Sequence, residues 1–289
     1  MKIVRIIGGL GNQMFQWAYM RSLGAVWPDE EVKADLRFFK GYGLHNGFEL
    51  RRVFGLDVPV ASRGELWKVT VPVGSYRLGR VREEAGLLRR SEVLEWKCRD
   101  VAKAMADSQK GYFWGYWQDE KYFKAVAGKV RADFRFPAFT EEKNVELAHR
   151  LAEGPWCSVH VRRGDYLKHK MYRGLCEADY YRRAIMEIRQ RVGEDVRFAV
   201  FSNDMGWVRE NLGNELGDDT VMVDWNSGSD SYRDMQLMSM CRHNIIANSS
   251  FSWWGAWLNG YEDKVVIAPK VWLNGKGAFN PACDSWVKI

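Results

Sequence analysis

Short apolar runs alternate with segments of helical periodicity from residue 156 to the end of the chain. The segment 177–192 shows the helical spacing, because Tyr181, Ala184 and Ile188 fall on one helical face. Strands that alternate with helices are typical of a parallel sheet, so we expect an α/β fold here. The expected strands lie at 156–161, 197–201, 221–223, 244–247 and 265–268.

The N-terminal part of the chain begins with the same pattern and then loses its regularity. Residues 2–7 predict a buried strand, which a glycine turn joins to a helix at about 12–23. Residues 24–110 mix both periodicities between Gly and Pro residues and define no clear order of elements. The segment 133–140, with Pro137, is typical of a connector.

Polar clusters follow three of the expected C-terminal strands. Residues 160–163 end the first strand, 202–204 follow the second, and 248–250 follow the fourth. Parallel sheets bind ligands beyond the carboxyl ends of their strands. We therefore expect the three clusters to meet on one edge of the sheet.

Two adjacent arginines, Arg162 and Arg163, stand at the end of a predicted buried strand. Arginine is rarely buried without a partner, and its planar fork matches phosphate oxygens. The pair therefore indicates a bound phosphate or diphosphate, and the alternative is an ion pair between domains. By the period of a strand, His160 and Arg162 share one face and Arg163 lies on the other. Asp165 lies close enough in the sequence to form an ion pair with either arginine.

The segment 248–252 carries hydroxyl and backbone N–H groups at a predicted strand-to-helix turn. Such a turn is typical of an anion cradle. The tryptophans that follow, at 253, 254 and 257, are more typical of a helix core than of a ligand platform.

Four other polar side chains each have two interpretations. Ser202 and Asp204 either contact the ligand or cap a helix expected at 205–212. Asp224 and Asp234 either accept hydrogen bonds from a base or ribose, or serve as caps and surface charges. The residues by themselves leave both interpretations open.

The turn at 8–14, Gly-Gly-Leu-Gly-Asn-Gln-Met, follows a strand and opens a helix. A dinucleotide-binding turn would need its third glycine at Met14, so a nicotinamide cofactor is not indicated. The glycines still admit a ligand close to the backbone, and Asn12 and Gln13 offer amides near a helix N-terminus. The alternative is a tight turn with Asn12 as the helix cap.

Several function classes find no support in the sequence. The chain has no G-x-x-x-x-G-K-[ST], no D-x-D and no H-x-x-x-H, so neither a P-loop nor a bound divalent metal is indicated. Five scattered cysteines without C-x-x-C fit a reducing compartment. No apolar stretch reaches the length of a membrane-spanning helix. We expect a cytoplasmic protein, either free or peripheral at the inner membrane.

Positive charge is concentrated in one part of this 289-residue chain, whose net charge is +6. Residues 51–110 hold 13 Lys or Arg against 8 Asp or Glu, a balance of +5. An excess of positive charge in one segment favours binding to an anionic membrane surface or to an acidic partner. Glu83, Glu84, Glu92 and Glu95 are interleaved with the cations, which favours an ordinary surface of mixed charge.

Six long motifs stand out in the chain, namely GGLGNQMFQ at 8–16, GYWQDEKYF at 115–123, HVRRGDY at 160–166, DMQLMSMCRH at 234–243, IIANSSFSWW at 245–254 and IAPKVW at 267–272. They resemble the bacterial α-1,2-fucosyltransferase family, and the resemblance covers essentially the whole chain. It implies an α/β fold of GT-B type, with two Rossmann-like lobes and the active site in the cleft between them. It also implies an acceptor-binding lobe at 1–140 and a GDP-fucose-binding lobe at 141–289.

The resemblance implies an inverting transfer of L-fucose from GDP-β-L-fucose to the 2-hydroxyl of a galactoside, with no metal or other cofactor. The acceptor would be a galactoside-terminated oligosaccharide or glycolipid, and no nucleic acid is expected as a partner. The expected catalytic residues are Arg162, Arg163, Asp165 and Asn12. The expected donor-binding residues are His160, Arg162, Arg163, Gly11, Asn12, Gln13, Ser202, Asp204, Asp234, Asn248, Ser249, Ser250, Phe251 and Ser252. The expected acceptor-binding residues are Tyr116, Trp117 and Gln118.

Two questions stay open at this point. The general base is Asp165, Asp119, Glu120 or His160, or the loose transition state needs little help from a base. Two rival classes remain, namely a glycosyltransferase with another GDP-sugar or linkage and a non-catalytic glycan-binding protein.

Overall fold

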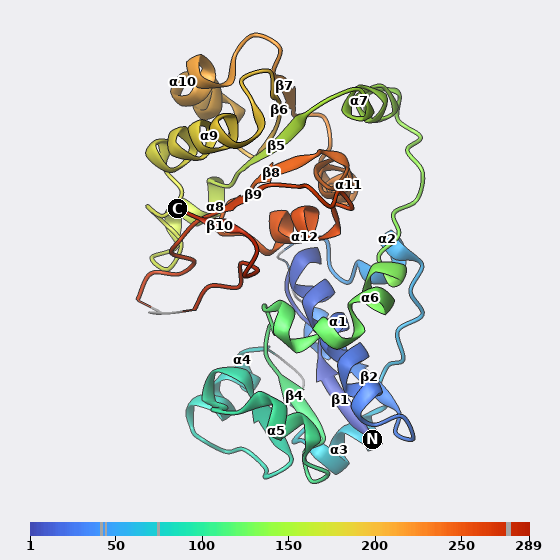
Figure 1. The fold of residues 1–289 in the computed structure, drawn as a ribbon. Coiled ribbons are helices and arrows are strands. Elements are labelled where there is room, and N and C mark those ends of the chain that lie inside the picture. Colours follow the sequence, from blue (N-terminus) through green and yellow to red (C-terminus); the bar gives the residue numbers. More distant parts are fainter. Residues whose placement is uncertain (41–42, 44, 74–75, 276–278) are drawn as a thin grey trace. The chain divides into compact units, whose positions relative to one another are not determined.

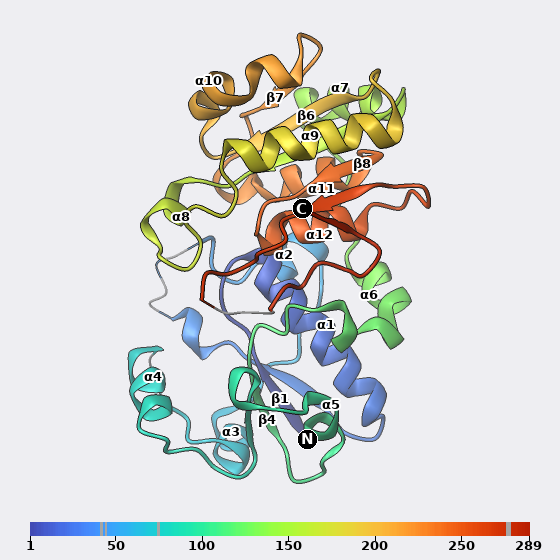
Figure 2. The same cartoon turned by 60° about the vertical axis from the view of Figure 1, so that its left-hand side comes forward.

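The computed structural model describes residues 1–40, 43, 45–73, 76–275 and 279–289. The chain divides into two compact units, Met1–Pro137 and Ala138–Ile289, and each is built on a parallel sheet (Figure 1, Figure 2). The expected α/β fold class with two lobes is therefore confirmed. The division falls inside the segment 133–140 that the sequence predicts as a connector. The assignment of acceptor and donor to the two lobes stays a prediction.

Unit 1, Met1–Pro137, has a four-stranded parallel sheet in the order β2-β1-β4-β3. Tyr112 and Trp114 of the sheet pack with Ile3 and Leu66 in a buried apolar cluster. The strands are β1 (Lys2–Arg5), β2 (Val32–Asp35), β3 (Glu92–Leu94) and β4 (Tyr112–Trp114).

The long helix α1 (Leu10–Val26) is the central helix of unit 1, and most of its residues are buried. Its Gln16 joins two segments, because Oε1 accepts from the Ile7 N–H at 2.9 Å and Nε2 donates to the Gly115 carbonyl at 3.0 Å. The other helices are α2 (Leu50–Phe54), α3 (Arg63–Val69), α4 (Tyr76–Glu84), α5 (Val101–Ala106) and α6 (Ala127–Asp133), with short 3-10 turns at Arg37–Phe39, Glu95–Lys97, Glu120–Tyr122 and Lys124–Val126.

Unit 2, Ala138–Ile289, has a six-stranded parallel sheet in the order β10-β9-β8-β5-β6-β7. Its central strand β5 (Trp156–Val161) is buried along its whole length. The other strands are β6 (Arg197–Ser202), β7 (Val221–Val223), β8 (His243–Ile245), β9 (Val266–Ala268) and β10 (Val287–Lys288).

Helices cover both faces of the unit 2 sheet, as Figure 2 shows. Val159 and Val161 of β5 face the cluster formed with α9 (Ala178–Val192) and α10 (Met205–Leu216). Trp156 faces the opposite cluster, formed with α7 (Glu142–Ala152) and α11 (Tyr232–Met240). The remaining helices are α8 (Gly164–Lys168) and α12 (Ser250–Leu258), with a 3-10 turn at Gly228–Asp230.

The predicted elements of the C-terminal half are confirmed, with ends that shift by at most a few residues. The sequence did not assign β2, β3, β4, β10, α6, α8 or the helices of 24–110. The predicted helix core of tryptophans is also confirmed, because Trp253, Trp254 and Trp257 of α12 are 0, 0 and 3% exposed. No described helix is both long and apolar enough to cross a membrane.

Candidate functional site

Three polar segments follow neighbouring strands of the unit 2 sheet and meet at its carboxyl edge. β5 lies between β6 and β8, and its last residue pairs with the last residue of β6. The Arg163 N–H donates to Asn203 Oδ1 at 3.0 Å, which joins the segment after β5 to the segment after β6. The Tyr166 hydroxyl contacts the Asn248 carbonyl at 3.4 Å, which joins it to the segment after β8.

The Arg162 side chain lies at this edge and remains partly open to solvent, with 31% exposed. Its Nη2 is 2.7 Å from Asp165 Oδ1, and its guanidinium lies 5.4 Å from the centre of the Tyr166 ring. Asp165 is itself 57% exposed. The carboxylate therefore orients the guanidinium without burying it, which leaves a planar fork available to an anion.

Arg163 lies in the turn after β5 and occupies a different environment, near the residues that begin α9 and α10. Its Nη1 is 2.7 Å from Glu177 Oε2, and its Nε is 3.6 Å from Asp204 Oδ2. The guanidinium lies 4.0 Å from the centre of the Trp207 ring, and the side chain is only 12% exposed. Arg163 thus connects the turn to the N-terminal ends of α9 and α10. Its predicted contact with a diphosphate stays a prediction.

The turn that carries both arginines depends on Gly164, whose φ is +37°. A Cβ at this position would lie 2.3 Å from Asn203 Nδ2, and Asn203 is already held by the Arg163 N–H. A side chain at 164 would therefore move the turn.

We expect Gly164→Ala to lower kcat about 10–100-fold, because a shift of about 1 Å misplaces a binding group. The matched control is Gly174→Ala in the same unit, where φ is +78° but nothing lies within 4 Å of the new Cβ. Steady-state rates compare the two variants. Equal losses of kcat in both variants would show that the positive φ of the replaced glycine, and not the contact with Asn203, causes the slower reaction.

His160 is the third member of the segment after β5, and it is only 6% exposed. Burial, followed by the nearby Arg162 charge, lowers the pKa of His160 to about 3. The imidazole is therefore neutral at neutral pH and is a poor proton acceptor. This environment disfavours His160 among the four candidates for the general base.

The segment 248–252 forms the start of α12. Ser249 Oγ caps the helix by accepting from the Phe251 N–H at 3.3 Å, and the Ser252 hydroxyl donates to the Ser249 carbonyl at 3.4 Å. Asn248 Nδ2 donates to the Trp272 carbonyl at 3.2 Å. Ser250 and Phe251 are half-buried, whereas Asn248 and Ser252 are buried. Their roles in binding an anion stay predictions.

Ser202 and Asp204 form the cap that the sequence offered as one of two interpretations. Asp204 Oδ1 accepts from the Trp207 N–H at 3.2 Å at the start of α10, and Ser202 Oγ accepts from the Asp204 N–H at 2.9 Å. Both side chains thus order the edge beside Arg163. Their contact with a donor stays a prediction.

Asp234, in the first turn of α11, is half-buried. Asn226 Nδ2 donates to Asp234 Oδ1 at 2.8 Å, and Asn226 is itself bonded to Asn144. Burial raises the pKa of Asp234 from 3.8 to about 7, although the Asn226 hydrogen bond lowers it. Near neutral pH this group therefore exists both as a carboxylic acid, which can donate, and as a carboxylate, which only accepts.

We expect Asp234→Asn to stabilise the fold at high pH. The raised pKa means that Asp234 keeps its proton to higher pH in the folded state than in the unfolded state. The free energy of unfolding of the unmodified protein therefore falls as pH rises from about 4 to 7. The asparagine of the variant cannot titrate, so the variant avoids this fall, and its advantage in unfolding free energy should grow over that range to about 2–4 kcal/mol. Urea unfolding from pH 4 to 8 measures it, and a difference independent of pH would contradict the argument.

Two predicted residues from unit 1 come together near the start of α1. Gln118 Nε2 donates to Asn12 Oδ1 at 2.6 Å, and both residues are half-buried. Gly8, at φ +95°, lies directly against Asn12, because a Cβ there would be 2.8 Å from Asn12 Nδ2. The structure thus places a polar pair beside the glycine turn, as a ligand site would require. Gly11, in the first turn of α1, is buried.

The structure corrects two of the predicted contacts in unit 1. Gln13 is 0% exposed, and its amide bonds to the carbonyls of Gly8 and Gly47 and to the Glu49 N–H. Trp117 is also 0% exposed, with its ring stacked on Tyr19 at 4.0 Å. Neither side chain is available to a ligand, because packing and hydrogen bonds within unit 1 enclose them. Tyr116, by contrast, is 43% exposed.

Glu95 organises this segment and was missed as a site residue. Its Oε2 accepts from the backbone N–H groups of Tyr116 and Trp117 at 2.8 and 2.9 Å. Burial raises the pKa of the Glu95 carboxyl. A glutamate directly after the three-residue strand β3 carries no sequence signal of this role, because its partners lie about twenty positions away.

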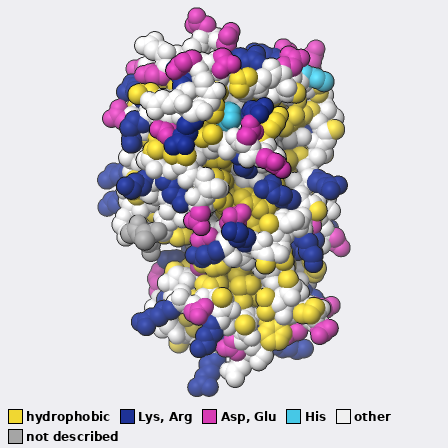
Figure 3. Space-filling view, viewed as in Figure 1, with side chains coloured by type: hydrophobic (Ala, Val, Ile, Leu, Met, Phe, Trp, Pro, Cys, Tyr) yellow, Lys and Arg dark blue, Asp and Glu magenta, His cyan; other side chains and the backbone are white. Residues whose placement is uncertain are grey.

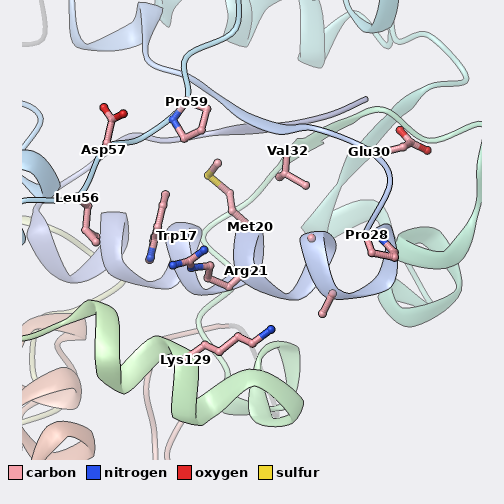
Figure 4. Close-up of a pocket in the computed structure, with 12 residues that line it drawn as sticks. Trp17, Met20, Arg21, Pro28, Glu30, Val32, Leu56, Asp57, Pro59 and Lys129 are labelled. Carbon is pink, nitrogen blue, oxygen red and sulfur yellow. The ribbon is translucent and has the colours of Figure 1, made fainter.

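A pocket of about 450 Å³ lies elsewhere in unit 1, against α1 (Figure 4). It combines apolar Trp17 and Met20 with charged Arg21 and Lys129. Arg21 already forms an ion pair with Asp133 at 2.6 Å. None of the predicted site residues lines this pocket.

Among residues 1–40, 43, 45–73, 76–275 and 279–289, no group of three or more His, Cys, Asp or Glu side chains is arranged to hold a metal ion. The predicted independence from metal is a statement about the reaction and stays a prediction.

Comparison with known proteins shows the family of the chain. The model of the protein family described as "Glycosyl transferase family 11" matches residues 90–282. An Escherichia coli protein named "Alpha-1,2-colitosyltransferase" is 35% identical over 297 residues, which cover 99% of this chain and 98% of the relative. The chain belongs to glycosyl transferase family 11. The resemblance drawn from the motifs is therefore confirmed.

Two further relatives show the range of this family. The Escherichia coli "O-antigen biosynthesis glycosyltransferase WbnK" is 30% identical over 304 residues, covering 98% of each chain. The "Galactoside alpha-(1,2)-fucosyltransferase 1" of Leontocebus fuscicollis is 26% identical over 270 residues, covering 90% of this chain and 66% of the relative. The family 11 chain is thus a glycosyltransferase of the fucosyltransferase-like class, and the alternative of a non-catalytic glycan-binding protein is set aside.

Proposed function

We propose that this glycosyltransferase moves L-fucose from GDP-β-L-fucose to the 2-hydroxyl of a β-galactoside, with inversion and without a metal ion. The observation that carries the proposal is the Arg162 guanidinium, held by Asp165 at 2.7 Å and still 31% exposed at the carboxyl edge of the sheet. A fixed, open fork beside a helix N-terminus matches a diphosphate.

The two arginines have separate roles in this proposal. Arg162 contacts the β-phosphate, and the start of α12 with Ser249 and Ser250 offers further donors to the same group. Arg163 is a positioning residue, because Glu177, Asp204 and Trp207 hold it against α9 and α10. Its ion pairs fix the turn and with it the direction of the Arg162 side chain.

The reaction exchanges one bond to the anomeric carbon for another. The bond from fucose C1 to the β-phosphate oxygen breaks, and its electron pair remains on GDP. The acceptor hydroxyl forms a new bond to C1 from the opposite face and loses its proton. Negative charge grows on the β-phosphate, so a fixed guanidinium stabilises the transition state more than the bound donor.

The acceptor side of the proposal rests on unit 1. Asn12 and Gln118 form a polar pair, and Tyr116 presents an exposed aromatic ring. Aromatic faces and amides are suitable groups for a sugar ring and its hydroxyls. Asp119 and Glu120 follow directly in the sequence, and with Asp165 they remain the candidates for the general base.

A second donor is favoured by one observation. The relative at 35% identity is named a colitosyltransferase, and colitose is fucose without its 3-hydroxyl. In this second proposal the enzyme uses GDP-colitose in place of GDP-fucose, and Arg162 keeps the same role at the diphosphate.

The test is GDP release from GDP-β-L-fucose and from GDP-colitose, each with and without lactose or N-acetyllactosamine, in EDTA. Release from GDP-fucose that a galactoside stimulates, with the fucoside linkage assigned by NMR, would support the proposal. A strong preference for GDP-colitose would support the second donor. Release that requires added metal, or no release from either donor, would contradict the proposal.

A further inference from the structure

Helix α4 and the segment that follows it expose several large apolar side chains. Leu78 and Val81 on α4 are 59 and 61% exposed, Leu87 is 66% exposed and Trp96 is 44% exposed. Leu78 and Val81 are three residues apart and share one helical face, whereas Gly79 and Glu83 face inward. Single exposed apolar residues are ordinary, but a group of this kind marks an interaction surface.

The same stretch exposes positive charge. Between residues 77 and 99, Glu84 is the only described acidic residue that is exposed, and it pairs with Arg80 at 3.1 Å. The following residue, Asp100, is exposed as well. In Figure 3, Lys and Arg side chains lie at the lower left of the view, where Figure 1 places α4, with acidic side chains among them. The exposed cations between residues 77 and 99 are Arg77, Arg80, Arg89, Arg90, Lys97 and Arg99.

Three of the four interleaved glutamates point inward, so residues 77–99 expose fewer acids than the sequence suggests. Across residues 51–110 the exposed acids include Asp57, Glu84 and Asp100, and the prediction of a mixed-charge surface for that whole range stays a prediction. Glu83 is 5% exposed and accepts from Trp96 Nε1 at 2.9 Å. Glu92 is buried and pairs with Arg82 and the Thr70 hydroxyl. Glu95 accepts from the backbone at 116 and 117. These acids attach α4 and β3 to unit 1 and leave the surface basic.

We propose that this surface, made of α4 and residues 87–97 and here called the α4 face, binds an anionic lipid bilayer. Its cations meet the lipid phosphates, while Val81, Leu87 and Trp96 reach the boundary between headgroups and acyl chains. Charge alone would suit an acidic protein. Separate aliphatic side chains set among cations, with a tryptophan beside them, suit the bilayer surface.

The binding test uses the full chain and vesicles, with no donor or acceptor present, so its result is independent of the proposed function. Flotation with phosphatidylcholine vesicles that contain phosphatidylglycerol should recover the protein, and vesicles of phosphatidylcholine alone should not. Because the charges are exposed, raising the salt from about 0.1 M to about 0.5 M should release most of it. No recovery on anionic vesicles, or equal recovery on both kinds, would overturn the proposal.

Charge-reversal variants locate the surface. The double variant Arg77→Glu with Arg90→Glu should lower the vesicle partition coefficient at least about tenfold. The matched control is Lys124→Glu with Lys129→Glu, two exposed cations of the same unit outside the α4 face, which changes the net charge equally. Equal losses in both double variants would show a general charge effect and would overturn the assignment to this face.

The apolar side chains need a separate variant. Val81→Ser with Leu87→Ser should lower binding several-fold, and it should leave the thermal midpoint unchanged because both side chains are largely exposed. Circular dichroism checks the fold of each variant. Full binding by this variant would mean that charge alone attracts the protein, which contradicts the proposed contact with the acyl boundary.

Discussion

Arg162→Ala is expected to lower kcat by about 10²–10³, equivalent to about 3–4 kcal/mol of transition-state stabilisation. The guanidinium is partly exposed and contacts Asp165 and the face of Tyr166, so its removal leaves no buried group without a partner. The fold should therefore survive. Arg162→Lys should also be slow, because a single ammonium cannot replace two parallel N–H donors. Steady-state kinetics with GDP-fucose measures both variants.

Two other arginines serve as comparisons for this result. Arg191 lies exposed in the last turn of α9 and pairs with Glu187, so Arg191→Ala should keep the normal rate. Arg163→Ala should lower the thermal midpoint as well as the rate, because that side chain packs on Trp207 and pairs with Glu177. A normal kcat in Arg162→Ala, or a loss of stability equal to that of Arg163→Ala, would contradict the role given to Arg162.

Trp117→Ala is expected to lower the free energy of unfolding by about 3–5 kcal/mol, as for other large aromatic residues removed from a core. The indole is 0% exposed, stacks on Tyr19 at 4.0 Å, and lies edge-to-face with Tyr122 at 5.7 Å. Its loss leaves a cavity that the long helix α1 cannot close. Chemical denaturation monitored by circular dichroism measures the change.

Trp67 provides the matched control, because it is 49% exposed on the short helix α3. Trp67→Ala should cost less than about 1 kcal/mol. Trp117→Phe keeps most of the packing and should keep the KM for the acceptor. A stable Trp117→Phe variant with a strongly raised acceptor KM would restore the predicted contact between Trp117 and the acceptor.

The elements of the C-terminal half could be predicted because each satisfies a local rule. A strand such as β5 is buried along its length and mostly apolar, because helices cover both faces of its sheet. The helix α9 shows its buried face as an apolar repeat of 3.6 residues. Polar residues at the carboxyl ends of neighbouring strands then predict the edge where the segments meet.

The strand predicted at 2–7 and the helix predicted at about 12–23 are confirmed as β1 and α1. The sequence predicted no order of elements for the middle of unit 1, and the reason is physical. β3 and β4 are only three residues long, too short to show any period. Their pairing comes from contacts between distant segments, such as the hydrogen bond from the Tyr112 hydroxyl to Asp35 Oδ2. Helices such as α2 and α3, of five and seven residues, are likewise held by their surroundings more than by their own periodicity.

Sequence patterns predicted the α/β class, the segments at the carboxyl edge and the family. The period of a strand could not predict the environments of the two arginines, because β5 ends at Val161 and both arginines lie in the turn after it. Packing between distant segments places Arg163 against Glu177 and Trp207 and leaves Arg162 partly open. Packing of the same kind encloses Trp117. Burial and ion pairing are properties of those distant neighbours, and local sequence carries no record of them.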